Sequence, residues 1–275
     1  MTKTLERILM TVQKPARYVG GEYNQIVKPR SEVELRVAFC FPDTYEIGMS
    51  NLGMRILYAA LNRMPGVWCE RVFAPWADME DALRSHDLPL YALESGDALN
   101  EFDVIAFTVG YEMSYTNILN MLRLGKVPLR AENRTELKHL VIAGGACVFN
   151  PEPLADFVDL FVIGEGEELD CEVLELYRTA KREGWDKQRF LREAVKIEGV
   201  YVPSFYEHSY NPDGTLAAIT PRCGAPAHVT KRIIQRLDDA LYPTDMIVPN
   251  TEIVHDRANL EVMRGCIRGC RFCHA

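Results

Sequence analysis

The run Leu35-Arg36-Val37-Ala38-Phe39-Cys40-Phe41 decides the fold, because six of its seven residues are apolar and Pro42 directly follows it. A strand with one exposed face alternates polar and apolar residues, whereas a strand buried on both faces is apolar nearly throughout. We therefore predict a buried strand here. Later runs that qualify as strands are Trp68–Phe73, Val104–Val109, Leu140–Ala143 and Leu160–Ile163.

Segments with helical periodicity lie between most of these runs. Asp78 and Ser114 are typical helix-start residues near two of them. Strands that alternate with helices predict an α/β fold with a parallel sheet covered on both faces. Such a sheet binds ligands beyond the carboxyl ends of its strands, where the chain order reverses. The predicted helices are 52–61, 77–85, 115–124 and 167–181.

Three loops at predicted strand ends are therefore candidate binding loops: Pro42–Gly48, Thr108–Ser114 and Gly144–Glu152. The pair Gly144-Gly145 would let the backbone come close to a flat or phosphate-bearing ligand, because no Cβ intervenes. The same pair also fits a tight strand-to-helix turn. Both interpretations stay open.

The remaining sequence divides into an arm and two C-terminal parts. We predict an N-terminal arm at 1–30, the sheet domain at 31–183, a linker region at 184–250 and the start of a further domain at 251–275. The linker contains a strand at 199–206 and a β-hairpin that turns at Asp213-Gly214. Residues 231–239 read as a charged helix or an extended connector. Asn259–Met263 reads as a strand leading into the last loop.

Composition excludes some classes of function. The chain has 48% hydrophobic and 25% charged residues, and its formal net charge is -8. That charge does not indicate nucleic acid as a generic partner, although a structured RNA substrate stays possible. No run approaches the length needed to span a membrane, and the first residues are too polar for a secretory signal. We expect no membrane partner and a cytoplasmic protein.

Three cysteines near the C-terminus, Cys266, Cys270 and Cys273, have Cys-x-x-x-Cys-x-x-Cys spacing. Thiolates are soft ligands, and three of them can hold three irons of a cubane while the fourth iron stays open. Glycines in the loop allow sharp turns around a cluster, and Arg264 and Arg268 could offset part of its charge. A structural zinc site with His274 is the alternative, although zinc ligands usually come as two separated pairs.

This loop resembles that of the radical S-adenosylmethionine (radical SAM) superfamily, which also has an aromatic residue before the last cysteine, here Phe272. The resemblance implies a [4Fe-4S] cluster on the three cysteines and S-adenosylmethionine (SAM) on the open iron, with Phe272 on the adenine side. It also implies reductive cleavage of SAM to a 5′-deoxyadenosyl radical, and an electron donor such as flavodoxin or ferredoxin. The loop would follow the first strand of a (β/α) barrel.

The sheet domain resembles the flavodoxin-like (Rossmann-like) cobalamin-binding domain that precedes the barrel in one radical SAM subclass. In that domain the first loop carries Asp-x-His-x-x-Gly, the second a small hydroxylated residue and the third a Gly-Gly pair, and a later strand ends in Gly-Glu-Gly-Glu. The resemblance thus implies cobalamin contacts at Asp43, Tyr45, Gly48, Thr108, Ser114, Gly144 and Gly145, with Gly164-Glu165-Gly166-Glu167 as the fourth motif.

Two of these positions have a second interpretation. Tyr45 stands where that domain has the histidine that ligates cobalt, and a phenol replaces imidazole poorly. Members of the subclass often lack this histidine and still bind cobalamin, so both bound cobalamin and a vestigial domain stay open. Glu165 and Glu167 begin a predicted helix, where acidic residues favour the helix dipole, so the motif also fits a helix cap.

The whole chain resembles a bacterial family of radical SAM proteins with an N-terminal cobalamin-binding-like domain. We expect the N-terminal part of an enzyme with an unknown substrate, in which methyl transfer through cobalamin is possible. A non-methylating radical SAM enzyme and a non-catalytic cobalamin-binding or scaffold module are the alternatives. Because the sequence ends two residues after Cys273, we expect the barrel to be truncated and this piece alone to be inactive.

Overall fold

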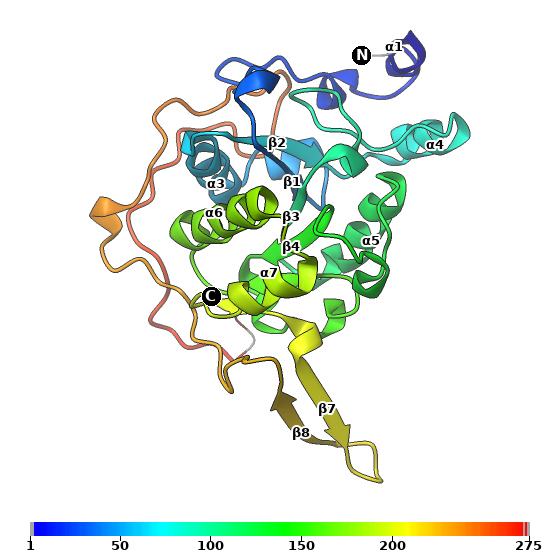
Figure 1. Ribbon diagram of the computed structural model, residues 1–275. Helices are drawn as coiled ribbons and strands as arrows, with labels where there is room; N and C mark the ends of the chain where they lie inside the picture. The colour runs from blue at the N-terminus through cyan, green and yellow to red at the C-terminus, as the bar shows by residue number, and fades with distance from the viewer. Residues whose placement is uncertain (1–2, 272, 274–275) are drawn as a thin grey trace.

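A six-stranded sheet forms the centre of the protein in a computed structural model, which describes residues 3–271 and 273 (Figure 1). The strands lie in the order β2-β1-β3-β4-β5-β6. The first five along the chain are parallel, and β6 pairs antiparallel with β5. The strands are β1 (Leu35–Phe41), β2 (Val67–Phe73), β3 (Val104–Thr108), β4 (Leu140–Gly144), β5 (Leu160–Val162) and β6 (Val200–Tyr201).

The strand order places a reversal of the chain between β1 and β3. The chain runs outward from β1 to β2, and then returns to the other side of β1 with β3 before it continues to β5. This is the flavodoxin-like order, and it leaves a crevice at the carboxyl ends of β1 and β3. The predicted parallel α/β fold is confirmed.

Helices cover both faces of the sheet. Helices α3, α6 and α7 lie on one face, and α4 and α5 lie on the other (Figure 1). None of the helices in the described part of the chain has the length and apolar character needed to cross a bilayer. The helices are α1 (Lys3–Leu9), α2 (Tyr45–Gly48), α3 (Leu52–Arg63), α4 (Ala77–Ser85), α5 (Tyr115–Leu124), α6 (Gly166–Glu183) and α7 (Lys187–Ala194).

The core has two layers, one on each side of the sheet. Val37 and Phe39 of β1 pack in the layer under α3 and α6, whereas Ala38 and Cys40 pack in the layer under α4 and α5. All four side chains are almost completely buried. Successive side chains of a strand point to opposite faces, so a strand between two helical layers must be apolar throughout. This is the reason that the 35–41 run has no polar alternation.

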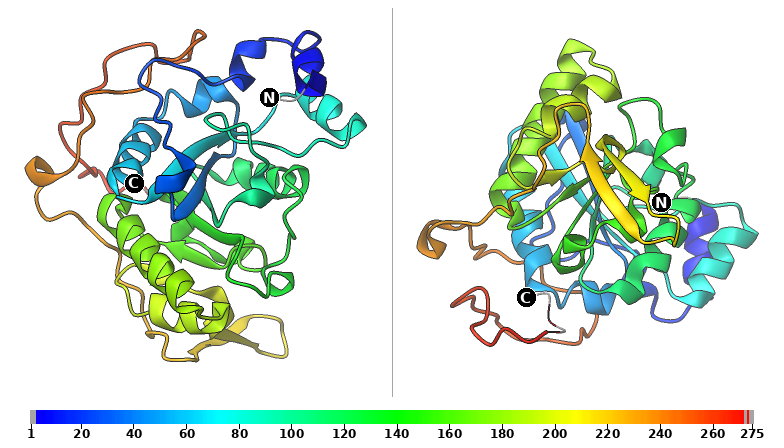
Figure 2. Two further views of the ribbon diagram at one scale, coloured as in Figure 1. Left: turned by 45° about the horizontal axis from the view of Figure 1, so that its top comes forward. Right: turned by 90° about the horizontal axis from the view of Figure 1, so that it is seen from below.

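A separate hairpin of β7 (Tyr206–Tyr210) and β8 (Leu216–Pro221) projects from the sheet (Figures 1 and 2). Its turn is held by Asp213, whose Oδ1 accepts a hydrogen bond from the backbone N–H of Thr215 at 3.0 Å. The hairpin predicted around Asp213-Gly214 is confirmed. Helix α7 and strand β6, which lie in the predicted linker, pack onto the sheet domain.

Residues 222–263, called the strap below, run along the outside of the sheet domain (Figure 1, orange to red). The strap first pairs at Arg232 with Gly164 and later pairs at Val248 with Tyr23 of the N-terminal arm. Ile247 of the strap is buried in the layer of α3 and α6. The strap therefore ties the N-terminal arm to the sheet and delivers the cysteine loop to the sheet edge.

Two sequence predictions in this region are wrong. Residues 259–263 do not form a strand, because a strand needs a neighbouring strand to pair with and this segment pairs with none of the described residues. The predicted strand at 199–206 is interrupted after Tyr201, where Pro203 begins a 3-10 turn and removes a backbone donor. Within 231–239, the described structure is a connector with a short 3-10 turn at Leu237–Asp239.

Candidate functional site

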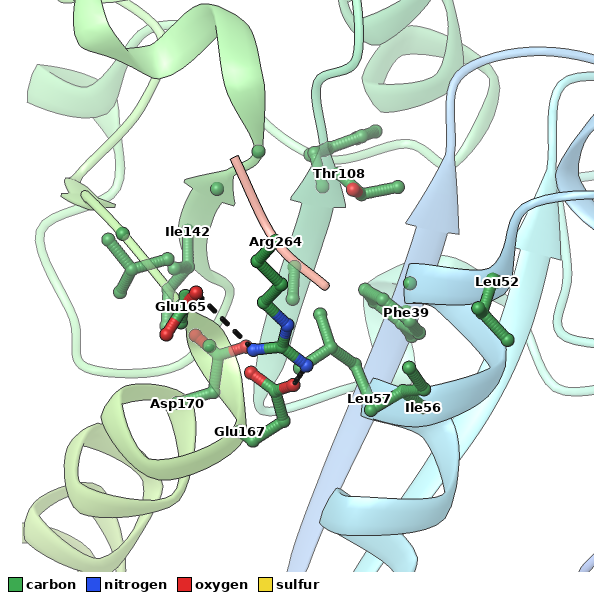
Figure 3. A pocket seen from close by; sticks show the side chains of 18 of the residues that line it. Phe39, Leu52, Ile56, Leu57, Thr108, Ile142, Glu165, Glu167, Asp170 and Arg264 are labelled. Atoms are coloured by element: carbon green, nitrogen blue, oxygen red, sulfur yellow. Dashed lines mark hydrogen bonds and ion pairs between the residues drawn. The ribbon is translucent and has the colours of Figure 1, made fainter. Parts of the chain in front are cut away.

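A cavity of about 300 Å³ lies at the carboxyl ends of β1, β3, β4 and β5. Its walls come from these strands and from α3 and α6, so it occupies the crevice that the strand order predicts (Figure 3). Phe39, Leu57 and Ile142 give it apolar walls. Of the predicted cobalamin contacts, Thr108, Gly144 and Gly145 line this cavity.

The backbone conformation at position 145 requires a glycine. Its φ of 109° is rarely adopted by other residues, and a Cβ there would lie 2.7 Å from the carbonyl oxygen of Val109. Next to it, the carbonyl of Gly144 accepts a hydrogen bond from Val109 N–H at 2.7 Å. The Gly-Gly pair therefore lets the loop after β4 cross the end of β3. It also forms part of the cavity wall.

The Gly164-Glu165-Gly166-Glu167 motif forms the opposite wall, at the start of α6. Gly164 has a φ of 120°, and a Cβ there would collide with the backbone of Arg232 in the strap. The Arg232 N–H donates to the Ile163 carbonyl at 2.9 Å, and the Glu165 N–H donates to the Arg232 carbonyl at 3.0 Å. The start of α6 is therefore fixed by the strap.

Arg264 of the cysteine loop enters the mouth of this cavity (Figure 3). Its guanidinium pairs with Glu167, with Glu165 at 3.5 Å and with Glu261 at 2.8 Å. The hydrogen bonds that Arg264 donates to Glu261 and Glu167 outweigh the effect of burial and raise the pKa of Arg264. The guanidinium charge is thus compensated at the sheet edge by carboxylates.

Asp170 lies one turn further along α6 and also lines the cavity. Burial, together with the negative charge of Glu167, raises the pKa of Asp170 to about 7. The carboxyl group is therefore partly protonated at neutral pH, when it can both donate and accept a hydrogen bond. Asp170 was not among the predicted site residues, and its only sequence signal is its position one turn after the Gly-Glu-Gly-Glu motif.

Tyr45 does not face the cavity. It is 1% exposed, and its hydroxyl donates to Glu22 Oε1 at 3.0 Å. Glu22 in turn accepts two hydrogen bonds from Arg71, both at 2.9 Å, and Arg71 Nε donates to Glu94 at 2.6 Å. Burial and the charge of Glu22 raise the pKa of the Tyr45 phenol. Tyr45 is thus a neutral member of a buried ionic cluster.

The other predicted contacts, Asp43, Gly48 and Ser114, do not line the cavity. The Asp43 carboxylate accepts a hydrogen bond from the Tyr111 hydroxyl at 2.7 Å. The Ser114 hydroxyl donates to the Tyr111 carbonyl at 2.7 Å and is buried. Gly48 has no room for a side chain, since a Cβ would meet the Phe73 ring. The structure therefore brings Thr108, Gly144 and Gly145 together, and leaves these three positions apart from them.

Large apolar side chains are exposed on the loops that follow β1, β2, β3 and β4. Each of these loops contributes to the carboxyl edge of the sheet. The exposed residues are Ile47, Trp76, Tyr111, Met113 and Phe149.

The cysteine loop follows the strap, and Cys266, Cys270 and Cys273 are exposed on it. The chain turns at Gly265 and Gly269, whose φ values are 81° and 61°. Within residues 3–271 and 273, no three Cys, His, Asp or Glu side chains are gathered to hold a metal ion. The donor set nevertheless fits an iron–sulfur cluster, because three thiols are accessible on a loop that can turn between them. Phe272 and His274 lie outside the described residues.

Residues 53–203, more than half of the chain, match the protein family described as radical SAM proteins, N-terminal. The chain belongs to this family. The match begins in α3 and ends just after β6, so this radical SAM N-terminal region contains the cavity walls contributed by β3, β4, β5 and α6.

The chain is also 27% identical, over 240 residues, to an uncharacterized protein of Methanocaldococcus jannaschii. The alignment covers 87% of this chain and 40% of that relative. The chain therefore spans about two fifths of the length of the curated relative that it matches. No solved structure matches the chain.

Proposed function

We propose that this chain is the N-terminal part of a radical SAM enzyme, and that Cys266, Cys270 and Cys273 bind a [4Fe-4S] cluster. Membership of the radical SAM N-terminal family supports the superfamily. The observation that carries the proposal is that the three-cysteine loop reaches the carboxyl edge of this domain, where Arg264 enters the cavity. A cofactor-bearing loop at a ligand-binding edge is the arrangement that such an enzyme needs.

When bound, such a cluster supplies the electron that cleaves SAM to a 5′-deoxyadenosyl radical. The chain's own cysteines would hold three irons as thiolates, and the turns at Gly265 and Gly269 would let the backbone pass close to the sulfides. Phe272 is proposed to contact the SAM adenine. Flavodoxin or ferredoxin is proposed as the electron donor.

We also propose that cobalamin binds at the carboxyl edge of the sheet. The cavity lined by Thr108, Gly144 and Gly145 supports this, because its volume of about 300 Å³ could take part of such a ligand. The exposed apolar side chains on other loops of the same edge could contact the large corrin ring. Tyr45 would not ligate the cobalt, because its neutral phenol is directed to Glu22. Bound cobalamin would supply a methyl group for transfer to the substrate.

One observation favours a second candidate, a non-methylating radical SAM enzyme with a vestigial cobalamin domain. The cavity mouth already contains the Arg264 side chain and its carboxylate partners. A ligand would have to share this space or displace the guanidinium. If it does neither, the sheet domain serves to hold the cluster loop.

The test is to purify the full polypeptide without oxygen, reconstitute it with iron, sulfide and hydroxocobalamin, and measure bound iron and cobalt together. Iron with cobalt supports the cobalamin-dependent enzyme. Iron alone supports the second candidate, and protein without iron contradicts the cluster assignment.

Substitution of the cysteines tests the ligand set. Cys266→Ala should abolish the broad absorbance at about 400 nm that cysteine-bound [4Fe-4S] clusters show. Cys223→Ala is the matched control, since Cys223 is also exposed but lies outside the loop. Equal spectra for the two variants would contradict the assignment of Cys266 as a ligand.

A further inference from the structure

Arg264 lies two residues before Cys266, the first of the three cysteines. Its side chain is 22% exposed, and that of its partner Glu167 on α6 is 9% exposed. The two residues are 97 positions apart in the chain. This contact joins the cysteine loop to the sheet domain, and it is better shielded from water than an ordinary surface ion pair.

The carboxylate side of this contact is held by groups other than Arg264. Glu165 and Glu167 lie at the N-terminus of α6, a helix of 18 residues, where the helix dipole favours negative charge. The hydrogen bonds between Arg232 and the β5–α6 turn hold that end in place. Glu165 also accepts a hydrogen bond from the Ile234 N–H of the strap. The strap thus holds the backbone at the start of α6 and the carboxylate of Glu165.

The donor side is also restrained. Glu261 accepts hydrogen bonds from Arg264 Nε and Nη2, both at 2.8 Å, and so orients the guanidinium from within its own segment. A planar guanidinium that bonds to several carboxylates has a defined direction, which a lysine ammonium would not provide. The contact therefore specifies where the backbone of residue 264 lies.

We propose that Arg264 is a positioning residue, and that Glu165 and Glu167 hold it so that the cluster loop stays at the mouth of the sheet cavity. Two residues of chain span at most about 7 Å. Anchoring Arg264 therefore confines the backbone of Cys266 to that radius, while Cys270 and the residues after it keep more freedom. This inference rests on the proposed cluster assignment and adds to it a role for the Gly-Glu-Gly-Glu motif.

The first measurement uses hydrogen–deuterium exchange of residues 258–271 in the full polypeptide without its cluster. The double variant Glu165→Gln/Glu167→Gln should exchange about tenfold faster over this segment, because charge-assisted hydrogen bonds become neutral ones. Glu168→Gln is the matched control. It changes the same first turn of α6, but its side chain is 60% exposed and only approaches Arg232.

Replacing Arg264 in place of the two glutamates distinguishes the loss of this contact from a general effect of the substitutions on α6. Arg264→Gln should raise exchange over 258–271 to a similar extent. Combining it with Glu165→Gln/Glu167→Gln should add little more, since the partners act as one unit. Arg268→Gln, on the exposed part of the same loop, should leave the exchange of 258–264 unchanged.

The second measurement is the rate at which the reconstituted cluster loses iron to a chelator. Glu165→Gln/Glu167→Gln should lose iron about tenfold faster than the wild type, and Glu168→Gln should not. Unchanged exchange and unchanged iron loss in the double variant would overturn the positioning role while the cluster assignment stands. If the double variant exchanges faster but neither it nor the wild type binds iron, the cluster assignment is wrong. The positioning of a cluster is then wrong as well.

Discussion

Replacing Asp170 by asparagine should make the protein more stable, and increasingly so as the pH rises. The pKa of Asp170 is raised to about 7 in the folded chain by burial and by Glu167, whereas an unfolded aspartate has a pKa of about 3.9. Below pH 4 both states are protonated. As the pH rises, the unfolded state ionises first, so the folded state loses stability between about pH 4 and pH 7.

The size of this change in stability follows from the difference between the folded and unfolded pKa values of Asp170. About three pKa units correspond to about 4 kcal/mol at pH 8. Because Asp170 lies in the wall of an open cavity, water screens part of this, and we take about 2 kcal/mol. At pH 5 the same calculation, with the same allowance for screening, gives a loss of stability of less than about 1 kcal/mol. Asparagine has nearly the same shape and no charge, so Asp170→Asn should remove the penalty.

Urea unfolding of the wild type and of Asp170→Asn at pH 5 and pH 8 measures this difference. The variant should gain stability at pH 8, and the gain should shrink at pH 5. Glu168→Gln removes a carboxylate from the same helix turn at an exposed position, and should show no such pH dependence. An equal difference between Asp170→Asn and the wild type at both pH values would refute the assigned pKa and its cause.

Other substitutions test the architecture. Arg71→Met leaves Glu22 and Glu94 buried without their cation, and should lower the free energy of unfolding by about 3–5 kcal/mol in urea titrations. Arg130→Met, at an exposed pair, should cost less than about 1 kcal/mol, and an equal loss in the two variants would contradict the first expectation. Gly145→Val should lower stability by more than about 2 kcal/mol by the same assay, from its strained φ and its clash with the β3 end, and should reduce cobalamin uptake if cobalamin binds.

The matched control for the glycine substitution is Gly110→Val. Gly110 lies on the same edge of the sheet, but it has open space around the Cβ position and no positive φ. It should tolerate valine with a change of less than about 0.5 kcal/mol. Equal destabilisation by Gly145→Val and Gly110→Val would show that the loop after β4 does not need a glycine to cross the end of β3.

The sheet could be predicted from the sequence because its strands are buried on both faces. The prediction for β1 coincides with its observed bounds, and those for β3 and β4 differ by one residue. Strand β6 lies within the predicted strand at 199–206, but the sequence did not show that the strand ends at Tyr201. Residues 259–263 show a different error, a predicted strand that does not form. Apolar residues in an extended segment do not specify a pairing partner.

The candidate site was predictable only where a motif marks it. Thr108 and Gly144 end β3 and β4, and Gly145 follows β4, so the fold alone placed them at one edge. The Arg264–Glu167 contact spans 97 residues and the Arg71–Glu22 contact spans 49, and no local pattern indicates which charges meet. Tyr45 illustrates the same limit, since its neighbour Glu22 belongs to an arm whose sequence indicates no chemistry.

The position of the strap also bears on how the polypeptide is synthesised. Strand β6 is complete at Tyr201, and Cys266 is added 65 residues later. N-terminal regions generally fold first as a chain leaves the ribosome. The helix end that carries Glu167 can therefore be in place before Cys266 has emerged, so the cysteine loop would have its docking partner as soon as it is made. The N-terminal arm is different, because Tyr23 can pair with Val248 of the strap only after Val248 has been synthesised.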